Sequence, residues 1–357
     1  MAQLCSAAYA AALVLEDGSV QVFGSLDVEL GLGQAHALPA LSPVSLGNSF
    51  EGECSVAVKA LSAVIGECHG LLLSDEGRVF TWGQGSCGAL GQGHFEDLAH
   101  PTSVLGGGLA SEVVVMASPG YSHVVALTRR GQVFVWGTSF NGELGTGPMQ
   151  ETHAEPVLLN RFGSKRVEIV GCGCAHSLAV DTDGCIWGWG ENGSGQLGLG
   201  DRLARSEPTL VEGQLASQCH SVVFIACSTR NSGAITNNNK LWLWGDGQYS
   251  KLPDSDDKLE PARICDPELD CVLAVACHEY FIVALSKSRE GRGFLKVWGG
   301  VIEATSGSDR APKGLLPAPL PLGVGDRYGR RSPTRIAGAL QVKSKAKLSM
   351  KNQEKGH

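Results

Sequence analysis

The 357-residue chain lacks the patterns that mark several common classes of protein. It contains no Cys-x-x-Cys pair, which argues against the usual zinc motifs. No run approaches the ~18 consecutive apolar residues that a membrane span needs, and no helix-length stretch has apolar residues at helical spacing. Charged residues make up only 18% of the chain, and the formal net charge is −7. A surface of this charge argues against broad binding of nucleic acid.

The first residues and the cysteines are both open to misinterpretation. The segment 1–18 is apolar like a secretory signal, but it has no basic start and its apolar run aligns with a repeated strand, so we expect it to be folded. Several of the 12 cysteines occupy one repeated position: Cys172, Cys227 and Cys277. Small thiols that recur in a strand favour packing over metal binding. Reduced thiols predict a cytoplasmic or nuclear protein.

Glycine, in contrast, is abundant, and it belongs to a repeat. The chain has 48 glycines without a collagen period, which indicates many turns. An aromatic-glycine dipeptide recurs about every 55 residues, with its aromatic residue at Phe23, Trp82, Trp136, Trp189, Trp244 and Trp298. Such a period, built from short alternating strands, is typical of a β-propeller.

Each repeat contains a strand, a tight turn and a second strand that ends in the aromatic-glycine dipeptide. The fourth unit has Asp183-Gly184 at its turn, a common hairpin pair. The fifth unit has Asn239 in place of the turn glycine, and asparagine is the other residue that tolerates a left-handed backbone. We therefore predict an all-β propeller of four-stranded antiparallel blades. Six repeats are recognisable, so the ring would have six or seven blades.

The repeats resemble the RCC1 family of β-propellers, named for the regulator of chromosome condensation. The resemblance rests on Gly-Cys-Ala-His176-Ser-Leu-Ala, Asp-Gly184, Trp-Gly190, Gly195-Gln-Leu-Gly-Leu-Gly200 and Glu-Pro208-Thr, which recur best in units two to four. It implies a propeller over residues 1–336, with a loop insertion at about 301–321. The remaining residues, 337–357, contain several lysines and no aromatic residue, and we expect a disordered basic tail.

Two motifs could carry chemistry, but both have simpler interpretations. Gly83-x-Gly85-x-x-Gly88 matches a dinucleotide fingerprint, yet poor helix formers follow it and similar loops recur elsewhere, so we expect turn glycines and no cofactor. His69, His123 and His176 occupy one repeated position, which we call the histidine slot; in the other units it holds Ala10, Asn231 and Phe281. We favour a role in satisfying backbone groups near the central channel. No catalytic or metal-binding set is predicted.

The leading functional hypothesis is a non-enzymatic scaffold that binds a protein through the loops around the histidine slot. Its candidate contacts are Glu67, His69, Tyr121, His123, His176, Arg230, Glu279 and Tyr280. The resemblance also implies an alternative, because some RCC1 propellers are guanine nucleotide exchange factors for a small GTPase such as Ran. There, carboxylates on one face matter; here, no acidic residue directly precedes the slot. A third possibility is chromatin or nucleic-acid association through Lys343–Lys351.

Overall fold

The computed structural model describes residues 3–6, 10–14, 19–24, 38–43, 59–66, 69–217, 221–247, 256–267, 269, 271–278, 281–288, 293–299 and 330–340. The predicted loop insertion at 301–321 therefore lies outside the described residues, as do residues 341–357 of the predicted tail. The last described strand runs to Leu340, beyond the predicted end of the propeller at residue 336. In the described part of the chain, no helix is long and apolar enough to cross a membrane.

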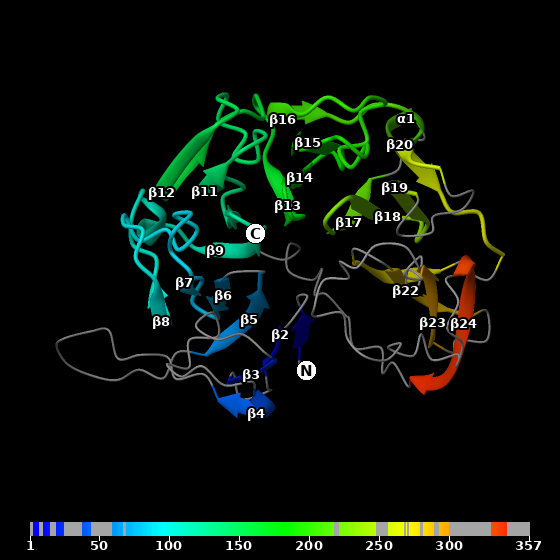
Figure 1. Cartoon of the computed structure of the whole chain (residues 1–357). Coiled ribbons are helices and arrows are strands. Elements are labelled where there is room, and N and C mark those ends of the chain that lie inside the picture. Colours follow the sequence, from blue (N-terminus) through cyan, green and yellow to red (C-terminus); the bar gives the residue numbers. More distant parts are fainter. Residues whose placement is uncertain are drawn as a thin grey trace, which may run out of the picture.

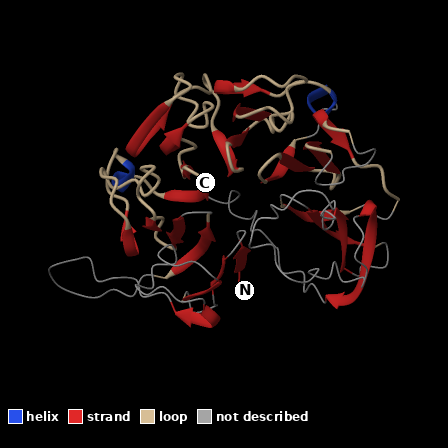
Figure 2. Cartoon of the chain, in the orientation of Figure 1, coloured by secondary structure: helices blue, strands red, loops and turns tan. Residues whose placement is uncertain are grey.

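The chain folds into consecutive four-stranded antiparallel sheets, each formed by four strands that follow one another in sequence. The strands are β1 (Gln3–Ser6), β2 (Ala10–Val14), β3 (Val20–Gly24) and β4 (Leu38–Pro43); β5 (Ala60–Ile65), β6 (His69–Ser74), β7 (Val79–Gly83) and β8 (Leu98–Ser103); β9 (Val114–Pro119), β10 (His123–Thr128), β11 (Val133–Ser139) and β12 (Glu151–Leu159); β13 (Val167–Cys172), β14 (His176–Asp181), β15 (Ile186–Gly190) and β16 (Arg205–Leu210); β17 (Val222–Cys227), β18 (Asn231–Thr236), β19 (Leu241–Gly245) and β20 (Lys258–Arg263); β21 (Val272–Cys277), β22 (Phe281–Lys287), β23 (Gly293–Gly299) and β24 (Arg330–Leu340). The described residues add a 3₁₀ turn, Leu109–Ser111, and a short helix α1 (Gln214–Ser217). Figure 2 shows how far strands outnumber helices.

The sheets are arranged as the blades of a propeller (Figure 1). Neighbouring sheets contact one another through their first strands, β1, β5, β9, β13, β17 and β21, which therefore lie innermost. This confirms the all-β propeller with four-stranded antiparallel blades. The described strands form six such sheets, and the side chains of the inner strands are described in five of them, from β5–β8 to β21–β24. The sheet β1–β4 precedes them with the same strand order, and its pairing is described for the backbone.

The hairpin turns follow the prediction from the sequence. The N–H of Gly184 donates to the carbonyl of Asp181, and φ of Gly184 is +79°. In the fifth unit Asn239 takes the same place with φ of 60°, the left-handed conformation that the sequence predicts for it. The turn chemistry is thus preserved although the residue differs. The glycine-rich motif at Gly83 is also a turn, because Gly83 and Gly88 have φ of +105° and +69° and strand β8 follows, without a helix.

A buried tryptophan joins each of the blades β9–β12, β13–β16 and β17–β20 to the blade before it. The indole Nε1–H groups of Trp136, Trp189 and Trp244 donate to the carbonyls of Ala89, Glu143 and Gln196, each at 2.8 Å. Each acceptor lies in the glycine-rich loop after the third strand of the preceding blade. The leucine that follows the acceptor, such as Leu144, is buried in the same core as the tryptophan. The aromatic-glycine repeat is therefore an element of the blade interface.

The same loop also makes close packing with the next tryptophan possible. Gly198 has φ of +77°, and a Cβ at this position would lie 3.0 Å from Nε1 of Trp244. Further out, the loop extends the neighbouring sheet: the N–H groups of Gly93, Gly147 and Gly200 donate to carbonyls of Ala154, Ser206 and Leu259 in the outer strand of the next blade. One loop thus contacts the next blade at two places, its buried tryptophan and its outer strand.

At the interface between blades β17–β20 and β21–β24, the described residues show other contacts. Nε1 of Trp298 has no hydrogen-bond partner among the described residues, although the side chain is fully buried. The interface instead buries an apolar cluster that includes Leu243, Val275 and Ile282. An ion pair between Lys296 and Asp266, 2.7 Å apart, lies beside it.

The two kinds of interface can be compared by one matched pair of substitutions. Trp189→Phe removes an indole hydrogen bond as well as apolar volume, whereas Trp298→Phe removes apolar volume and an indole N–H that has no partner among the described residues. We expect Trp189→Phe to lower the free energy of unfolding by about 1 kcal/mol more, the net value of one buried hydrogen bond. Urea unfolding of both variants measures this difference. Equal losses would show that the bond from Trp189 contributes nothing.

Candidate functional site

The histidine slot lies at the start of the second strand of each blade. His69, His123 and His176 begin β6, β10 and β14, and each is paired with the glycine of the aromatic-glycine dipeptide, as in His176 with Gly190. All three side chains are at most 1% exposed. They cannot make the direct partner contacts that we expect for them from the sequence. The backbone crowds them, since a Cβ on Gly173 would lie 2.2 Å from Cε1 of His176.

Two of these histidines connect one blade to the next through a serine. Nε2 of His123 is 2.9 Å from Oγ of Ser177, and Nε2 of His176 is 2.9 Å from Oγ of Ser232. Each serine directly follows the slot residue of the next blade. Each also donates to the loop carbonyl that accepts the tryptophan bond: Ser177 to Glu143 at 3.1 Å and Ser232 to Gln196 at 2.7 Å. One carbonyl thus accepts from both the tryptophan and the serine.

The direction of these bonds excludes the serines as activated nucleophiles. A hydroxyl has one proton, and a carbonyl can only accept, so the hydroxyl of Ser232 donates its hydrogen bond to the carbonyl of Gln196. Nε2 of His176 must then carry a proton and donate it to Oγ of Ser232. A general base would need the opposite arrangement, with an unprotonated nitrogen accepting from the hydroxyl. Both serines are also fully buried. The His–Ser pairs are therefore structural.

The slot loses these bonds where the next blade has an apolar residue in place of the serine. Val124 follows the slot in the blade after His69, and Ile282 follows it in the blade after Asn231. Both ring nitrogens of His69 and both amide atoms of Asn231 are buried without a hydrogen-bond partner among the described residues. The polar connection therefore spans the middle blades and ends at either side of them.

Burial keeps the slot histidines neutral. It lowers the pKa of His69 and His123 to about 4 and that of His176 to about 3, and the nearby His123 adds to the effect on the other two. Nδ1 of His123 and of His176 has no hydrogen-bond partner among the described residues, so a second proton there would be a buried charge without compensation from them. These histidines are poor candidates for proton transfer near neutral pH.

The repeated cysteines lie on the innermost strands and are free thiols. Burial raises the pKa of Cys172 and of Cys277 to about 12, and that of Cys227 well above its ordinary value. Sγ of Cys172 donates to the carbonyl of Ser118 in the neighbouring blade at 3.1 Å. Within the described residues, no group of three or more histidine, cysteine, aspartate or glutamate side chains is placed to hold a metal ion.

The loops in front of the slot form a rigid rim around the channel. The N–H of Tyr121 donates to the carbonyl of Cys174 in the next blade, and the N–H of Cys174 donates to Ser228 in the blade after that. The side chain of Tyr121 is 42% exposed on this rim. The side chain of Arg230 is 50% exposed, with Nη1 at 3.9 Å from Oδ2 of Asp246.

Two acidic residues that the sequence analysis missed also belong to this rim. Glu191 and Asp246 directly follow the Trp-Gly dipeptides, and their N–H groups donate to the carbonyls of Ala175 and Arg230. The pKa of Glu191 is raised by burial, against the opposing effect of Arg230. The position after each Trp-Gly dipeptide was the signal that could have revealed them, because it faces the residue before the slot.

The predicted contact residues are thus divided into three groups. Tyr121 and Arg230 lie exposed on the rim. His69, His123 and His176 lie beneath it and are buried. Glu67, Glu279 and Tyr280 lie outside the described residues.

Comparison with known families decides the relationship that the geometry suggests. Residues 1–345 match the family model described as the RCC1-like domain. The chain belongs to the RCC1-like family. The match covers the whole propeller, including the sheet β1–β4 and the strand β24.

Curated relatives share the repeats but are longer proteins. The ultraviolet-B receptor UVR8 of Arabidopsis thaliana is 31% identical over 241 residues, which are 67% of this chain and 52% of that protein. The human E3 ubiquitin-protein ligase HERC2 is 32% identical over 251 residues, 69% of this chain and 5% of HERC2. A probable human E3 ubiquitin-protein ligase, HERC6, is 32% identical over 56% of this chain and 20% of its own length. This chain thus spans from about a twentieth to about half of these relatives.

Solved structures show the same fold at lower identity. Yeast RCC1 (Prp20), in a complex with Kap60, has a TM-score of 0.72 at 18% identity, over 95% of this chain and 75% of that one. Human WBSCR16 has a TM-score of 0.67 at 23% identity, over 78% of this chain and 70% of that one. At these identities the likeness concerns the fold alone.

The neutral histidines predict acid sensitivity. Their pKa is about 6.5 in the unfolded chain and lower in the folded chain, so between these values the unfolded state binds more protons. Stability should therefore fall as the pH drops from about 6.5 towards 4, by up to about 1.4 kcal/mol per pH unit for each histidine. Urea unfolding at several pH values measures the slope.

A control for this prediction is His176→Asn, because Asn231 occupies the same slot in the fifth unit. The variant loses one titrating group and should show a shallower decline between pH 6.5 and 4 than the parent. An unchanged slope would mean that His176 does not report the buried, neutral state described above.

Proposed function

We propose that this RCC1-like propeller is a non-enzymatic scaffold that binds a protein partner through the rim of the histidine-slot face. The observation that carries the proposal is the division of roles at this face. The histidines and serines are buried, and their hydrogen bonds are used to join blades, while Tyr121 and Arg230 are presented above them. Tyrosine and arginine are the residue types most enriched where binding energy is concentrated.

Rigidity of the rim supports this proposal. Backbone hydrogen bonds join the loops of three successive blades at Tyr121, Cys174 and Ser228, so little order needs to be gained on binding. The face also carries both charges, with Arg230 next to Glu191 and Asp246. A partner with complementary charges would be selected through these groups.

Relatives are consistent with protein binding as the common use of the fold. The yeast protein was solved in complex with Kap60, and a second structure of it, with a TM-score of 0.71 at 18% identity, was described together with its binding to Gsp1p and histones. A cytoplasmic or nuclear location of this chain belongs to the same proposal. Exchange activity on a small GTPase and association with chromatin are its alternatives.

The proposal is tested by a pair of substitutions on the rim. A protein recovered with the full chain should be lost when Tyr121→Ala and Arg230→Glu are combined, with at least a tenfold rise in Kd. Arg78→Glu is the matched control, because Arg78 is exposed at the hairpin turn β6–β7, at the other end of the strands. A partner that is lost equally with Arg78→Glu, or retained by the double variant, would place the interface elsewhere.

Release of fluorescent GDP from a panel of small GTPases, Ran included, separates the scaffold from an exchange factor. We expect no acceleration by the full chain, while a chelator of magnesium releases the nucleotide as a positive control. Strong acceleration for one GTPase would replace the scaffold proposal by exchange activity. In that case, the Tyr121→Ala and Arg230→Glu variant should be assayed next for loss of exchange.

A further inference from the structure

The second strand of the last blade is only partly covered, unlike its counterparts in the blades before it. Strands β6, β10, β14 and β18 are buried at every residue. In β22, burial alternates: Phe281, Val283 and Leu285 are partly exposed, and the residues between them are buried. Successive side chains of a strand point to opposite sides of its sheet. One whole side of this blade is therefore incompletely covered, and it is apolar.

The other blades show which side this is. In the fourth blade, Leu178 and Val180 pack against the following blade, whereas Ala179, between them, packs against the preceding blade. We call these the leading side and the trailing side of a blade. From β5–β8 to β17–β20, each leading side is covered by the trailing side of the following blade. The strand register places on the leading side of β21–β24 the residues Phe281, Val283, Leu285 and Leu295.

No described sheet covers the leading side of β21–β24. The innermost strands of successive blades contact one another from β1 to β21, but β21 and β1 make no contact of comparable extent. Each described sheet consists of four consecutive strands, so none combines strands of the first and the last blade. Figure 1 shows β1–β4 and β21–β24 as the two ends of an arc of blades. The described strands therefore leave the ring unjoined at one place.

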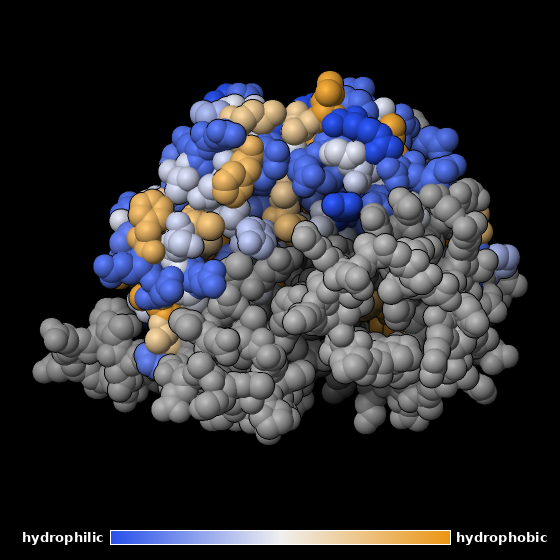
Figure 3. Space-filling model, in the orientation of Figure 1, coloured by the Kyte–Doolittle hydropathy of each residue, from blue (hydrophilic) through white to orange (hydrophobic). Residues whose placement is uncertain are grey.

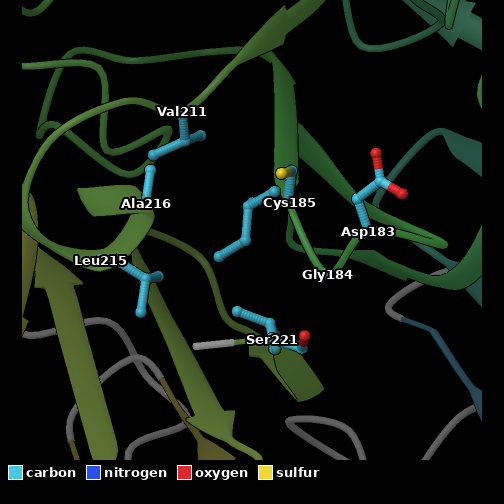
Figure 4. Close-up of a pocket in the computed structure, with 9 residues that line it drawn as sticks. Asp183, Gly184, Cys185, Val211, Leu215, Ala216 and Ser221 are labelled. Atoms are coloured by element: carbon cyan, nitrogen blue, oxygen red, sulfur yellow. The ribbon is translucent and has the colours of Figure 1, made fainter. Parts of the chain in front are cut away.

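The described junctions between blades are filled much more completely. Between β13–β16 and β17–β20, a pocket of about 250 Å³ remains beside the hairpin turn Asp183–Cys185 (Figure 4), while Leu178 in the same junction is fully buried. Over the described exterior, hydrophobic side chains are scattered among hydrophilic ones (Figure 3). Single exposed apolar side chains are normal on soluble proteins. A row of them along one strand, as on β22, indicates a surface that another element covers.

The trailing side of β1–β4 is the matching surface. The backbone register of this sheet is that of the other blades, since Ala11 is paired with Phe23 as Ser177 is paired with Trp189. No blade precedes this sheet among the described strands. Its trailing positions are held by Leu4, Ala11, Leu13 and Phe23. All four residues are apolar, like those of the exposed leading side.

The polar groups of the middle junctions are absent from both surfaces. A middle junction joins a slot histidine to a serine of the following blade, and its loop carbonyl accepts from a tryptophan. In the last and the first blade, the slot holds Phe281, the serine position holds Ala11, and the tryptophan position holds Phe23. These side chains have no N–H or O–H group, so contact between the two surfaces leaves no polar group unpaired at these positions.

A change on one side only has a different result. After the slots of His69 and Asn231, an apolar residue takes the serine position in the following blade. The polar side-chain atoms of both residues are buried without a hydrogen-bond partner among the described residues. An unpaired buried polar group costs free energy. At Phe281 and Ala11 both members are apolar, which is what a direct contact between them requires.

We propose that the trailing side of β1–β4 docks on the leading side of β21–β24 and closes the ring through apolar contacts alone. In the closed ring, Ala11 lies against Phe281, as Ser232 lies against His176. This joint has none of the hydrogen bonds to a shared carbonyl that hold the middle junctions. The ring therefore opens and closes at this joint, and a partner that contacts loops on both sides of it binds only the closed ring.

A double-mutant cycle on the full chain tests the contact. Phe281→His and Ala11→Ser together recreate the pair that His176 forms with Ser232. Each substitution alone buries an unpaired polar group in the closed ring, so the double variant should be more stable than the two single effects predict. We expect a coupling of about fivefold in the unfolding equilibrium constant, measured in urea. Additive effects would overturn the proposal.

The matched control uses the next residue of the same strand. Ala12 follows Ala11 and therefore occupies a leading position of β2. Phe281→His combined with Ala12→Ser should show no coupling. A coupling of equal size in this control would not come from contact at Ala11 and would contradict the proposal.

Photo-cross-linking identifies the occupant of the exposed side without those variants. With p-benzoylphenylalanine in place of Phe281, mass spectrometry of the illuminated monomer should find a cross-link to β2, residues 10–14. Cross-links between two copies would assign the surface to a second chain, and cross-links only to residues 300–329 or 341–357 would assign it to those segments. Either result overturns closure by β1–β4. Thermal unfolding before illumination verifies that the substituted protein is folded.

Hydrogen exchange tests whether the ring opens at this joint. The amides of β2 and β22 should exchange at least tenfold faster than those of β14, because an open joint leaves each end blade with a single neighbour. Phe281→His combined with Ala11→Ser should slow this exchange about fivefold. Equal protection of β2, β22 and β14 in the parent chain would overturn the assignment of the joint as the place of opening.

Discussion

A shared carbonyl at the blade interface is the constraint on which the packing of the blades from β9–β12 to β17–β20 depends. The carbonyl of Gln196 accepts from the indole of Trp244 and from the hydroxyl of Ser232, and the serine in turn accepts from His176. One backbone oxygen thus accepts from two side chains of the next repeat, and the serine links a histidine of the preceding repeat to them. Because every one of these atoms is buried, the loss of any partner leaves a polar group without compensation. The identity of residues far apart in the sequence is fixed by this one requirement.

The same constraint makes the histidines poor candidates for catalysis. A serine within 2.9 Å of a histidine has the spacing of a catalytic pair. The serine hydroxyl donates its hydrogen bond to a backbone carbonyl, so it cannot donate to the histidine as well. Burial then holds the imidazoles neutral and out of reach of any partner. The exposed rim above them and the hairpin turns on the other side remain accessible to a partner.

The two faces differ in how they could recognise a partner. The slot face offers a backbone-braced rim with a tyrosine, an arginine and two acidic residues. The side with the hairpin turns offers a small pocket between two blades and charged side chains of both signs. Both are positioned by the innermost strands, whose register and bulges are repeated from blade to blade. A ring of blades presents loops at both of its faces.

The sequence by itself determined the repeat, the hairpin turns and the all-β propeller. The turn at Asn239 could be predicted because few residues tolerate a positive φ, and the aromatic-glycine dipeptides mark the period. Only the tertiary structure decided the fate of the predicted contacts. His69, His123 and His176 share a slot, but only the structure shows that His123 and His176 are buried against serines of the next blade. The contact between Val222 and Gly184 joins two blades, which a pattern within one repeat does not contain.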